Sequence, residues 1–184
     1  MDLFQSDPVR NSFGVSETQA IRVKRWMQEN NVVWGLDGKH RGEWNQPKKT
    51  HQTWKSALDR GWLGQWIGEN DDEGNLYYHR IESVDEQELW AVFSMYMRKL
   101  QNAARSAKSR KTLQGWVEWL RTIESNFFTY QEEQNDGAKP LQYIFDVLND
   151  MVSAGTGSAE IPFRVFKTEL EQLIDKAGAS GAVF

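Results

Sequence analysis

Residues 83–104, SVDEQELWAVFSMYMRKLQNAA, decide the fold class of this chain. Ser83 is followed three residues later by Glu86, a capping-box pair that is typical of a helix N-terminus. Apolar side chains then recur at spacings of three and four, as one broad face of a helix requires. These positions are Leu89, Trp90, Val92, Phe93, Tyr96, Met97, Leu100, Ala103 and Ala104. The pattern predicts a long amphipathic helix with an aromatic inner face.

The same spacing predicts three helices downstream. One covers residues 113–128, a second begins near Pro140, and a third begins near Pro162 and ends at Gly178. Proline suits the first turn of a helix because the missing N–H has no intrahelical partner there. The predicted inward positions include Trp116, Trp119, Phe127, Ile144, Phe145, Leu148, Phe166, Leu170, Leu173 and Ile174.

Two more helices are predicted upstream. Ser16 and Gln19 form another capping box, and the apolar stripe that follows, from Ala20 through Ile21 to Met27, stops near Asn30. Thr50 can cap the second, whose apolar positions are Trp54, Ala57, Leu58, Trp62, Leu63, Trp66 and Ile67. Gly61 and Gly64 lower its helix propensity but permit another helix to approach closely.

The remaining segments are irregular. Residues 31–49 contain three glycines and one proline, so we expect an ordered loop in which Val32, Val33, Trp34 and Leu36 are buried. The string LYYHRI at residues 76–81 is compatible with one short strand. Six amphipathic helices and at most one strand or hairpin predict an all-α fold. We expect a single helical domain over residues 1–184, with loosely held ends at 1–12 and 178–184.

The composition restricts the function. A net charge of -4 in 184 residues argues against a surface devoted to polyanions, so any nucleic-acid contact must be local. The absence of cysteine excludes disulfides and thiolate chemistry. No apolar run is long enough to cross a membrane, which favours a cytoplasmic chain. Nine tryptophans suit an aromatic core or a surface covered by another polypeptide.

Motifs for catalysis are missing from the sequence. There is no Walker A string, GxGxxG or GxSxG, and His40, His51 and His79 lie in three different segments. Paired acids such as Asp71-Asp72 and Glu132-Glu133 lie in turns, where solvated acids are common. We therefore expect no enzyme activity, no cofactor, no metal and no small-molecule substrate.

A basic segment, residues 98–111, is the one concentration of charge with a candidate function. Its cations are Arg98, Lys99, Arg105, Lys108, Arg110 and Lys111. They could contact DNA phosphates or an acidic partner. The interpretation we favour is that cations gather at a helix C-terminus because of the helix dipole.

Two strings in the N-terminal half carry a family resemblance. FGVSETQAIRVKRWMQENNVVWGLDGKHR at residues 13–41 and HQTWKSALDRGWLGQWI at 51–67 resemble, in order and spacing, blocks of the gamma chain (RecC subunit) of exodeoxyribonuclease V. The matching signature positions are Arg25, Trp26, Trp34, Gly35, Leu36, Asp37, Trp54, Asp59 and Arg60. Weaker similarity continues at 98–128 and 161–174. Val33 departs from the pattern, since Arg is usual there.

The resemblance implies a place in a larger protein. RecC is similar to a helicase without its ATPase motifs, and this block would be a helicase 2B-like accessory insertion. It implies RecB-like and RecD-like partner subunits, DNA contact through the full-length protein, and a scaffolding role in double-strand-break repair and recombination. The signature positions would be structural, with Trp34 and Leu36 in the core and Asp37 capping a turn.

Two alternatives belong to other classes. The chain could be a local DNA-backbone-binding module that uses the basic segment. It could also be a free-standing helical interaction domain with aromatic docking surfaces.

Overall fold

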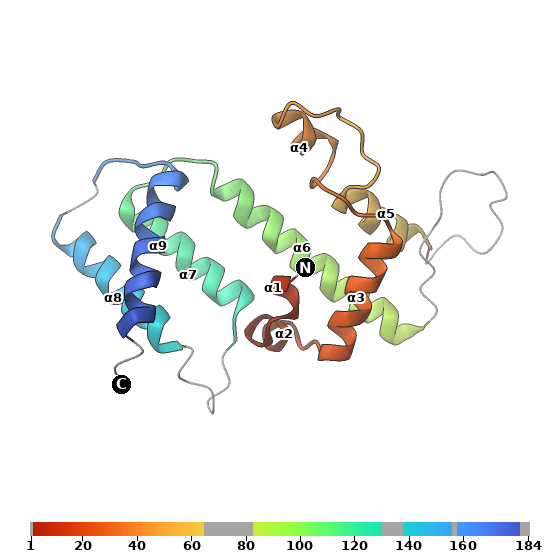
Figure 1. The fold of residues 1–184 in the computed structure, drawn as a ribbon, viewed down its shortest axis with the longest axis horizontal. Helices are drawn as coiled ribbons and strands as arrows, with labels where there is room; N and C mark the ends of the chain where they lie inside the picture. The colour runs from red at the N-terminus through yellow and green to blue at the C-terminus, as the bar shows by residue number, and fades with distance from the viewer. Residues whose placement is uncertain (1, 65–82, 130–137, 156–157, 181–184) are drawn as a thin grey trace. The chain divides into compact units, whose positions relative to one another are not determined.

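The computed structural model describes residues 2–64, 83–129, 138–155 and 158–180, and within them all regular secondary structure is helical (Figure 1). The helices in these ranges are α1 (Asp2–Gln5), α2 (Asp7–Phe13), α3 (Glu17–Glu29), α4 (Gly38–Glu43), α5 (Trp54–Gly64), α6 (Val84–Ser106), α7 (Leu113–Phe127), α8 (Ala138–Ser153) and α9 (Phe163–Ser180). Extended pairing in the described part is limited to an antiparallel bridge between Lys111 and Ile161. The all-α prediction is confirmed.

All six predicted helices are present as α3 and α5–α9. Three short helices, α1, α2 and α4, were not predicted, because one or two turns are too short for a periodic pattern. Residues 1–12, expected to be loosely held, include α1, whose Phe4 is fully buried. The suggested strand at 76–81 and the helix positions Trp66 and Ile67 lie outside the described residues.

Polar caps fix where the helices begin. Ser16 Oγ accepts from the Gln19 amide at 3.2 Å, and Gln19 Oε1 accepts from the Ser16 amide at 2.8 Å, so the capping box at α3 is complete. Ser83 Oγ likewise accepts from the Glu86 amide. The prediction for Thr50 was wrong. The N-terminal turn of α5 is held instead by Thr53, whose Oγ1 accepts from the Ser56 amide at 3.3 Å.

The contacts divide the chain into two compact units. The first comprises residues 1–6 and 13–98, and the second comprises residues 7–12 and 99–184. The division falls inside α6, between Arg98 and Lys99. The expectation of a single domain stays a prediction.

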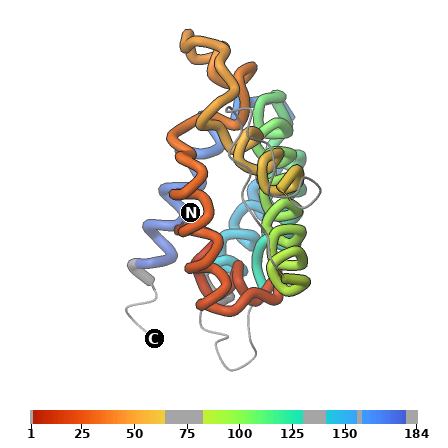
Figure 2. Tube along the Cα trace, turned by 90° about the vertical axis from the view of Figure 1, so that its right-hand side faces the viewer, coloured from red at the N-terminus to blue at the C-terminus, as the bar shows by residue number. Residues whose placement is uncertain are grey.

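The core of the first unit surrounds Trp90 on α6. Its indole lies 5.4 Å from that of Trp26 on α3, and both views show these two helices side by side (Figure 2). Gly61 on α5 is buried against the same indole, as the close-approach prediction required. Phe4 of α1 adds an edge contact to Phe93.

The core of the second unit surrounds Trp116 on α7. Its ring is stacked on Phe166 of α9, with centroids 5.3 Å apart, and its Nε1 donates to the Ile161 carbonyl at 3.0 Å. Helix α8 packs against both α7 and α9 and supplies Phe145 and Leu148 to this core. A buried indole with a satisfied N–H contributes apolar area without an unpaired donor.

Some predicted core positions are exposed. Ile21 is 47% exposed and Ile174 50% exposed, and Trp62 and Leu63 also face outward. On each of these helices the predicted apolar face is broader than the face that is buried. The four residues lie at the edge of the predicted face, where the helix surface is exposed. Helix α9 also continues through Gly178 to Ser180 instead of ending there.

Candidate interaction surfaces

Half of the cations of the basic segment bind the chain's own main chain. Lys99 Nζ donates to the Asn126 carbonyl at 3.3 Å, and Arg110 donates to the Glu160 carbonyl at 2.7 Å. Lys111 Nζ donates to the Ser106 carbonyl, in the last turn of α6, at 2.9 Å. These contacts satisfy backbone acceptors, as the helix-dipole interpretation expects for Lys111.

The other three cations, Arg98, Arg105 and Lys108, are exposed. Arg98 belongs to the first compact unit, whereas Arg105 and Lys108 belong to the second. In the second unit, Arg105, Lys108 and Arg110 are the exposed cations of the basic segment, and Arg110 among them also donates to the Glu160 carbonyl.

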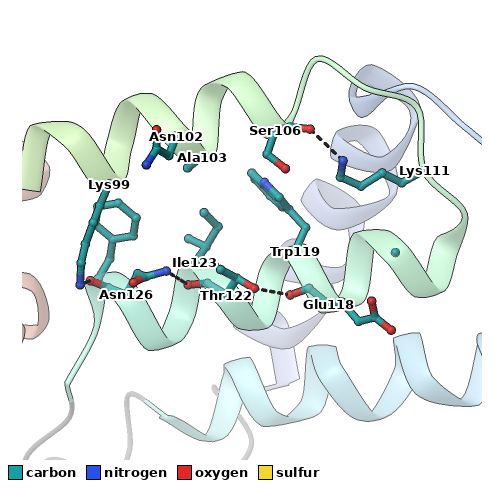
Figure 3. Close-up of a pocket in the computed structure, with 12 residues that line it drawn as sticks. Lys99, Asn102, Ala103, Ser106, Lys111, Glu118, Trp119, Thr122, Ile123 and Asn126 are labelled. Atoms are coloured by element: carbon teal, nitrogen blue, oxygen red, sulfur yellow. Dashed lines mark hydrogen bonds between the residues drawn. The ribbon is translucent and has the colours of Figure 1, made fainter.

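A groove of about 450 Å³ lies between α7 and the C-terminal part of α6 (Figure 3). Lys99, Asn102 and Ser106 line it from α6, and Trp119 extends into it from α7. The Trp119 indole Nε1 is buried and has no hydrogen-bond partner. Because Glu118 also lines the groove, its charge has no single sign, and it indicates no class of ligand.

The signature string WGLDGKHR folds into a clamped loop in the first unit. The Arg41 guanidinium donates to the Trp34 carbonyl at 2.8 and 3.0 Å, to that of Gln52 at 3.2 Å and to that of Lys49 at 3.3 Å. Asp37 caps α4, since its Oδ1 accepts from the His40 amide at 2.7 Å. One planar guanidinium therefore holds three carbonyls, of residues 34, 49 and 52, and so joins two segments of the loop.

Gly35 turns the backbone inside this loop. Its φ of 91° is in a region that side chains with a Cβ rarely adopt. The Gly35 and Leu36 carbonyls accept from the Trp54 and Lys55 amides, which ties the loop to the start of α5. The backbone of the loop thus makes the inward contacts.

The side chain of Trp34 consequently does not fill the core, and this prediction was wrong. Trp34 is 41% exposed and Val33 is 71% exposed, while Leu36 is half-buried. The Trp34 ring lies 5.6 Å from His40, and His40 lies 6.4 Å from Trp44, which is 65% exposed. The loop presents a row of rings on its outer side.

A second groove, of about 650 Å³, lies beside these rings and is lined by Trp34, Arg41, Trp44, Pro47, Lys49 and His51 among others. We call it the Trp34 groove. Sequence reasoning missed it, because Trp44, Lys49 and His51 have no periodic relation to Trp34. The side-chain bonds of Arg41 and the bonds from the Val33 and Trp34 amides to the Gln52 carbonyl bring these segments together.

The remaining signature positions have separate surroundings. Trp26 is buried, Trp54 is half-buried and Arg25 is exposed. Arg60 donates to the Asn30 carbonyl at the end of α3 at 2.6 Å, and burial lowers the pKa of its guanidinium from the ordinary value.

Asp59 pairs with Lys55 at 2.5 Å on the exposed side of α5. An exposed pair of this kind contributes little to stability.

Among the residues that the structure describes, no three His, Cys, Asp or Glu side chains are grouped so that they could hold a metal ion. None of the helices in those ranges has the length and apolar character needed to span a bilayer.

Within the described ranges the regular secondary structure is therefore helical, and Arg41 and Arg60 donate to main-chain carbonyls of the first unit. Residues 1–178 match the family described as RecBCD enzyme subunit RecC fourth domain. The chain belongs to this family, as the resemblance of its two N-terminal blocks predicted.

The individual relatives have low sequence identity to the chain, and all of them carry the same name, RecBCD enzyme subunit RecC. The chain is 25% identical over 124 residues to RecBCD enzyme subunit RecC of Mycobacterium tuberculosis strain H37Rv, which covers 66% of this chain and 11% of the relative. It is 21% identical over 167 residues to the Escherichia coli K12 subunit, covering 89% and 15%. It is 18% identical over 178 residues to that of Buchnera aphidicola, covering 95% and 17%. The chain thus spans less than a fifth of the length of these relatives.

Proposed function

We propose that this chain is a non-catalytic, helicase 2B-like scaffolding domain of a RecC-type subunit. In this proposal the full-length subunit works in the cytoplasm beside RecB-like and RecD-like subunits and DNA. The assembly is a helicase–nuclease that acts in double-strand-break repair and recombination. The observation that carries the proposal is the family match over residues 1–178.

The use of polar groups in the first unit supports a structural role. Arg41 and Arg60 donate to main-chain carbonyls, and Asp37 caps a helix. A group that acts on a substrate must have donors or acceptors directed at the reacting atoms. These three groups instead direct theirs at the domain's own backbone.

Two assays test this proposal. The purified chain should hydrolyse no ATP and cleave no DNA, and the full-length subunit should co-purify with RecB-like and RecD-like subunits. ATP or DNA turnover that is abolished by changing one defined residue of the chain would refute the non-catalytic role. Failure of the full-length subunit to co-purify with either partner would refute the scaffolding role.

The basic segment supports a second candidate function, local binding of DNA phosphates. The exposure of Arg105 and Lys108 favours it, whereas the backbone bonds of Lys99, Arg110 and Lys111 leave fewer cations for DNA.

The charge reversals Arg105→Glu and Lys108→Glu test this candidate with little disturbance of the fold. Arg164→Glu, an exposed position on α9 of the same unit, is the control. Binding to duplex DNA that is steeply salt-dependent and is lost only in the first pair would support the candidate. Unchanged binding in the pair would remove it.

A further inference from the structure

The Trp34 groove combines exposed indoles with positive charge. Trp44 is 65% exposed and Trp34 41% exposed, although large apolar rings are ordinarily covered. Both line the groove together with Lys49 and Arg41, and no acidic side chain is among its lining residues.

The segment that forms the groove, residues 33–52, has a net positive charge. Residues 33–52 contain four Lys or Arg and two acids, whereas the whole chain has a net charge of -4. One of the acids, Asp37, is engaged as the cap of α4. The surroundings of the groove are therefore cationic on an otherwise acidic chain, which is complementary to an anion.

The groove is also fixed in shape by the fold. Arg41 holds the carbonyls of Trp34, Lys49 and Gln52, which are residues that line the groove. Holding the backbone of a platform in place before binding reduces the entropy lost when a ligand is bound.

We propose that the Trp34 groove binds single-stranded nucleic acid, with bases stacked on Trp34 and Trp44 and phosphates near Lys49. A flat aromatic face accepts any unpaired base, and adjacent cations attract the backbone. A duplex cannot stack its paired bases on these rings. This site is separate from the basic segment and goes beyond the scaffolding function.

The test is fluorescence anisotropy with a labelled oligothymidylate, using the 184-residue chain. Trp44→Ala is expected to weaken binding at least about fivefold, as loss of one stacking ring does. Trp62→Ala, another exposed tryptophan of the same unit that is not among the lining residues of the groove, should leave affinity unchanged. Circular dichroism and urea midpoints check that each variant is folded.

Charge and strandedness supply independent readouts. Lys49→Glu should reduce the slope of log affinity against log salt by about 0.7, the value for one lost phosphate contact on a single strand. Arg164→Glu, an exposed change on α9, should not change it.

Three outcomes would overturn the proposal. They are no binding by the wild-type chain at low salt, equal affinity of wild type and Trp44→Ala, and tighter binding of a hairpin duplex than of the single strand. Loss of a partner subunit by full-length Trp44→Ala, with oligonucleotide binding intact, would assign the groove to a protein and would also overturn it.

Discussion

Gly61 of α5 lies directly against the indole of Trp90 on α6. A Cβ built on Gly61 would be 2.0 Å from Cζ2 of Trp90, well inside van der Waals contact. Trp90 is fully buried, so its ring has little freedom to move away. The packing of these two helices depends on the absence of one methyl group.

Substitution of Gly61 by alanine is therefore expected to destabilise the first unit. Overpacking of a rigid core should lower the free energy of unfolding by about 1–3 kcal/mol or more, which exceeds the gain in helix propensity. Gly178→Ala in α9 is the matched control, since a Cβ there meets nothing within 4 Å. The control should gain up to about 1 kcal/mol. Urea unfolding of both variants checks this, and similar shifts in the two would contradict the packing.

Two tryptophans should differ in their contribution to stability. Trp116→Ala removes a fully buried ring stacked on Phe166 and should cost about 3–5 kcal/mol. Trp34→Ala removes a partly exposed ring and should cost less than about 1 kcal/mol. Thermal or urea unfolding measures both. A large loss for Trp34→Ala would show that its ring is buried after all.

The bonds of Arg41 to the carbonyls of Trp34, Lys49 and Gln52, which we call the Arg41 clamp, predict that lysine cannot replace arginine at this position without loss of stability. A single ammonium cannot reach three carbonyls in the geometry of a guanidinium, so Arg41→Lys should lose about 1–3 kcal/mol. Hydrogen exchange of the Trp54 and Lys55 amides, which bond to the Gly35 and Leu36 carbonyls, should accelerate. Lys39→Ala, an exposed change on α4, should leave both amides protected. Unchanged protection in Arg41→Lys would exclude the clamp.

Tyr96 predicts a loss of stability at alkaline pH. Burial raises the pKa of its phenol from 10.0 to about 12. Because the unfolded chain releases this proton more easily, the contribution to stability is complete below pH 10 and declines as pH rises toward 12. The decline should be at most about 3 kcal/mol, given ~1.4 kcal/mol per unit of pKa. Tyr96→Phe should flatten this part of the stability profile, and an identical decline in the variant would assign it to other groups.

The regular part of the fold was predictable from the sequence because local signals agreed with packing. Ser16 with Gln19 marks a helix start by chemistry alone, and the stripe through Trp90 and Phe93 fixes which face of α6 is inward. Gly61 in a helical stripe also indicates a close helix approach, although the sequence does not identify Trp90 as the contacting residue. Such signals act within one or two turns and need no information about distant residues.

The side chains exposed at the candidate surfaces could not be predicted, because their positions depend on contacts between residues far apart in the sequence. Hydrophobicity suggested that Trp34 is buried, but the positive φ of Gly35 and the bonds of Arg41 hold the loop with this ring outward. The cations of the basic segment are evident in the sequence, yet the partners of Lys99 and Arg110 lie 27 and 50 residues away in the sequence. Long-range hydrogen bonds of this kind follow from the fold.

Assembly of the full-length subunit with its partners tests the scaffolding proposal most directly. Full-length Gly61→Ala, compared with Gly178→Ala, would be co-expressed with RecB-like and RecD-like subunits, and ATP-dependent DNA degradation would be measured per mole of assembled complex. A scaffolding domain predicts fewer complexes for Gly61→Ala, each with the activity of the control. A normal yield of complexes with a lowered activity per complex would contradict it.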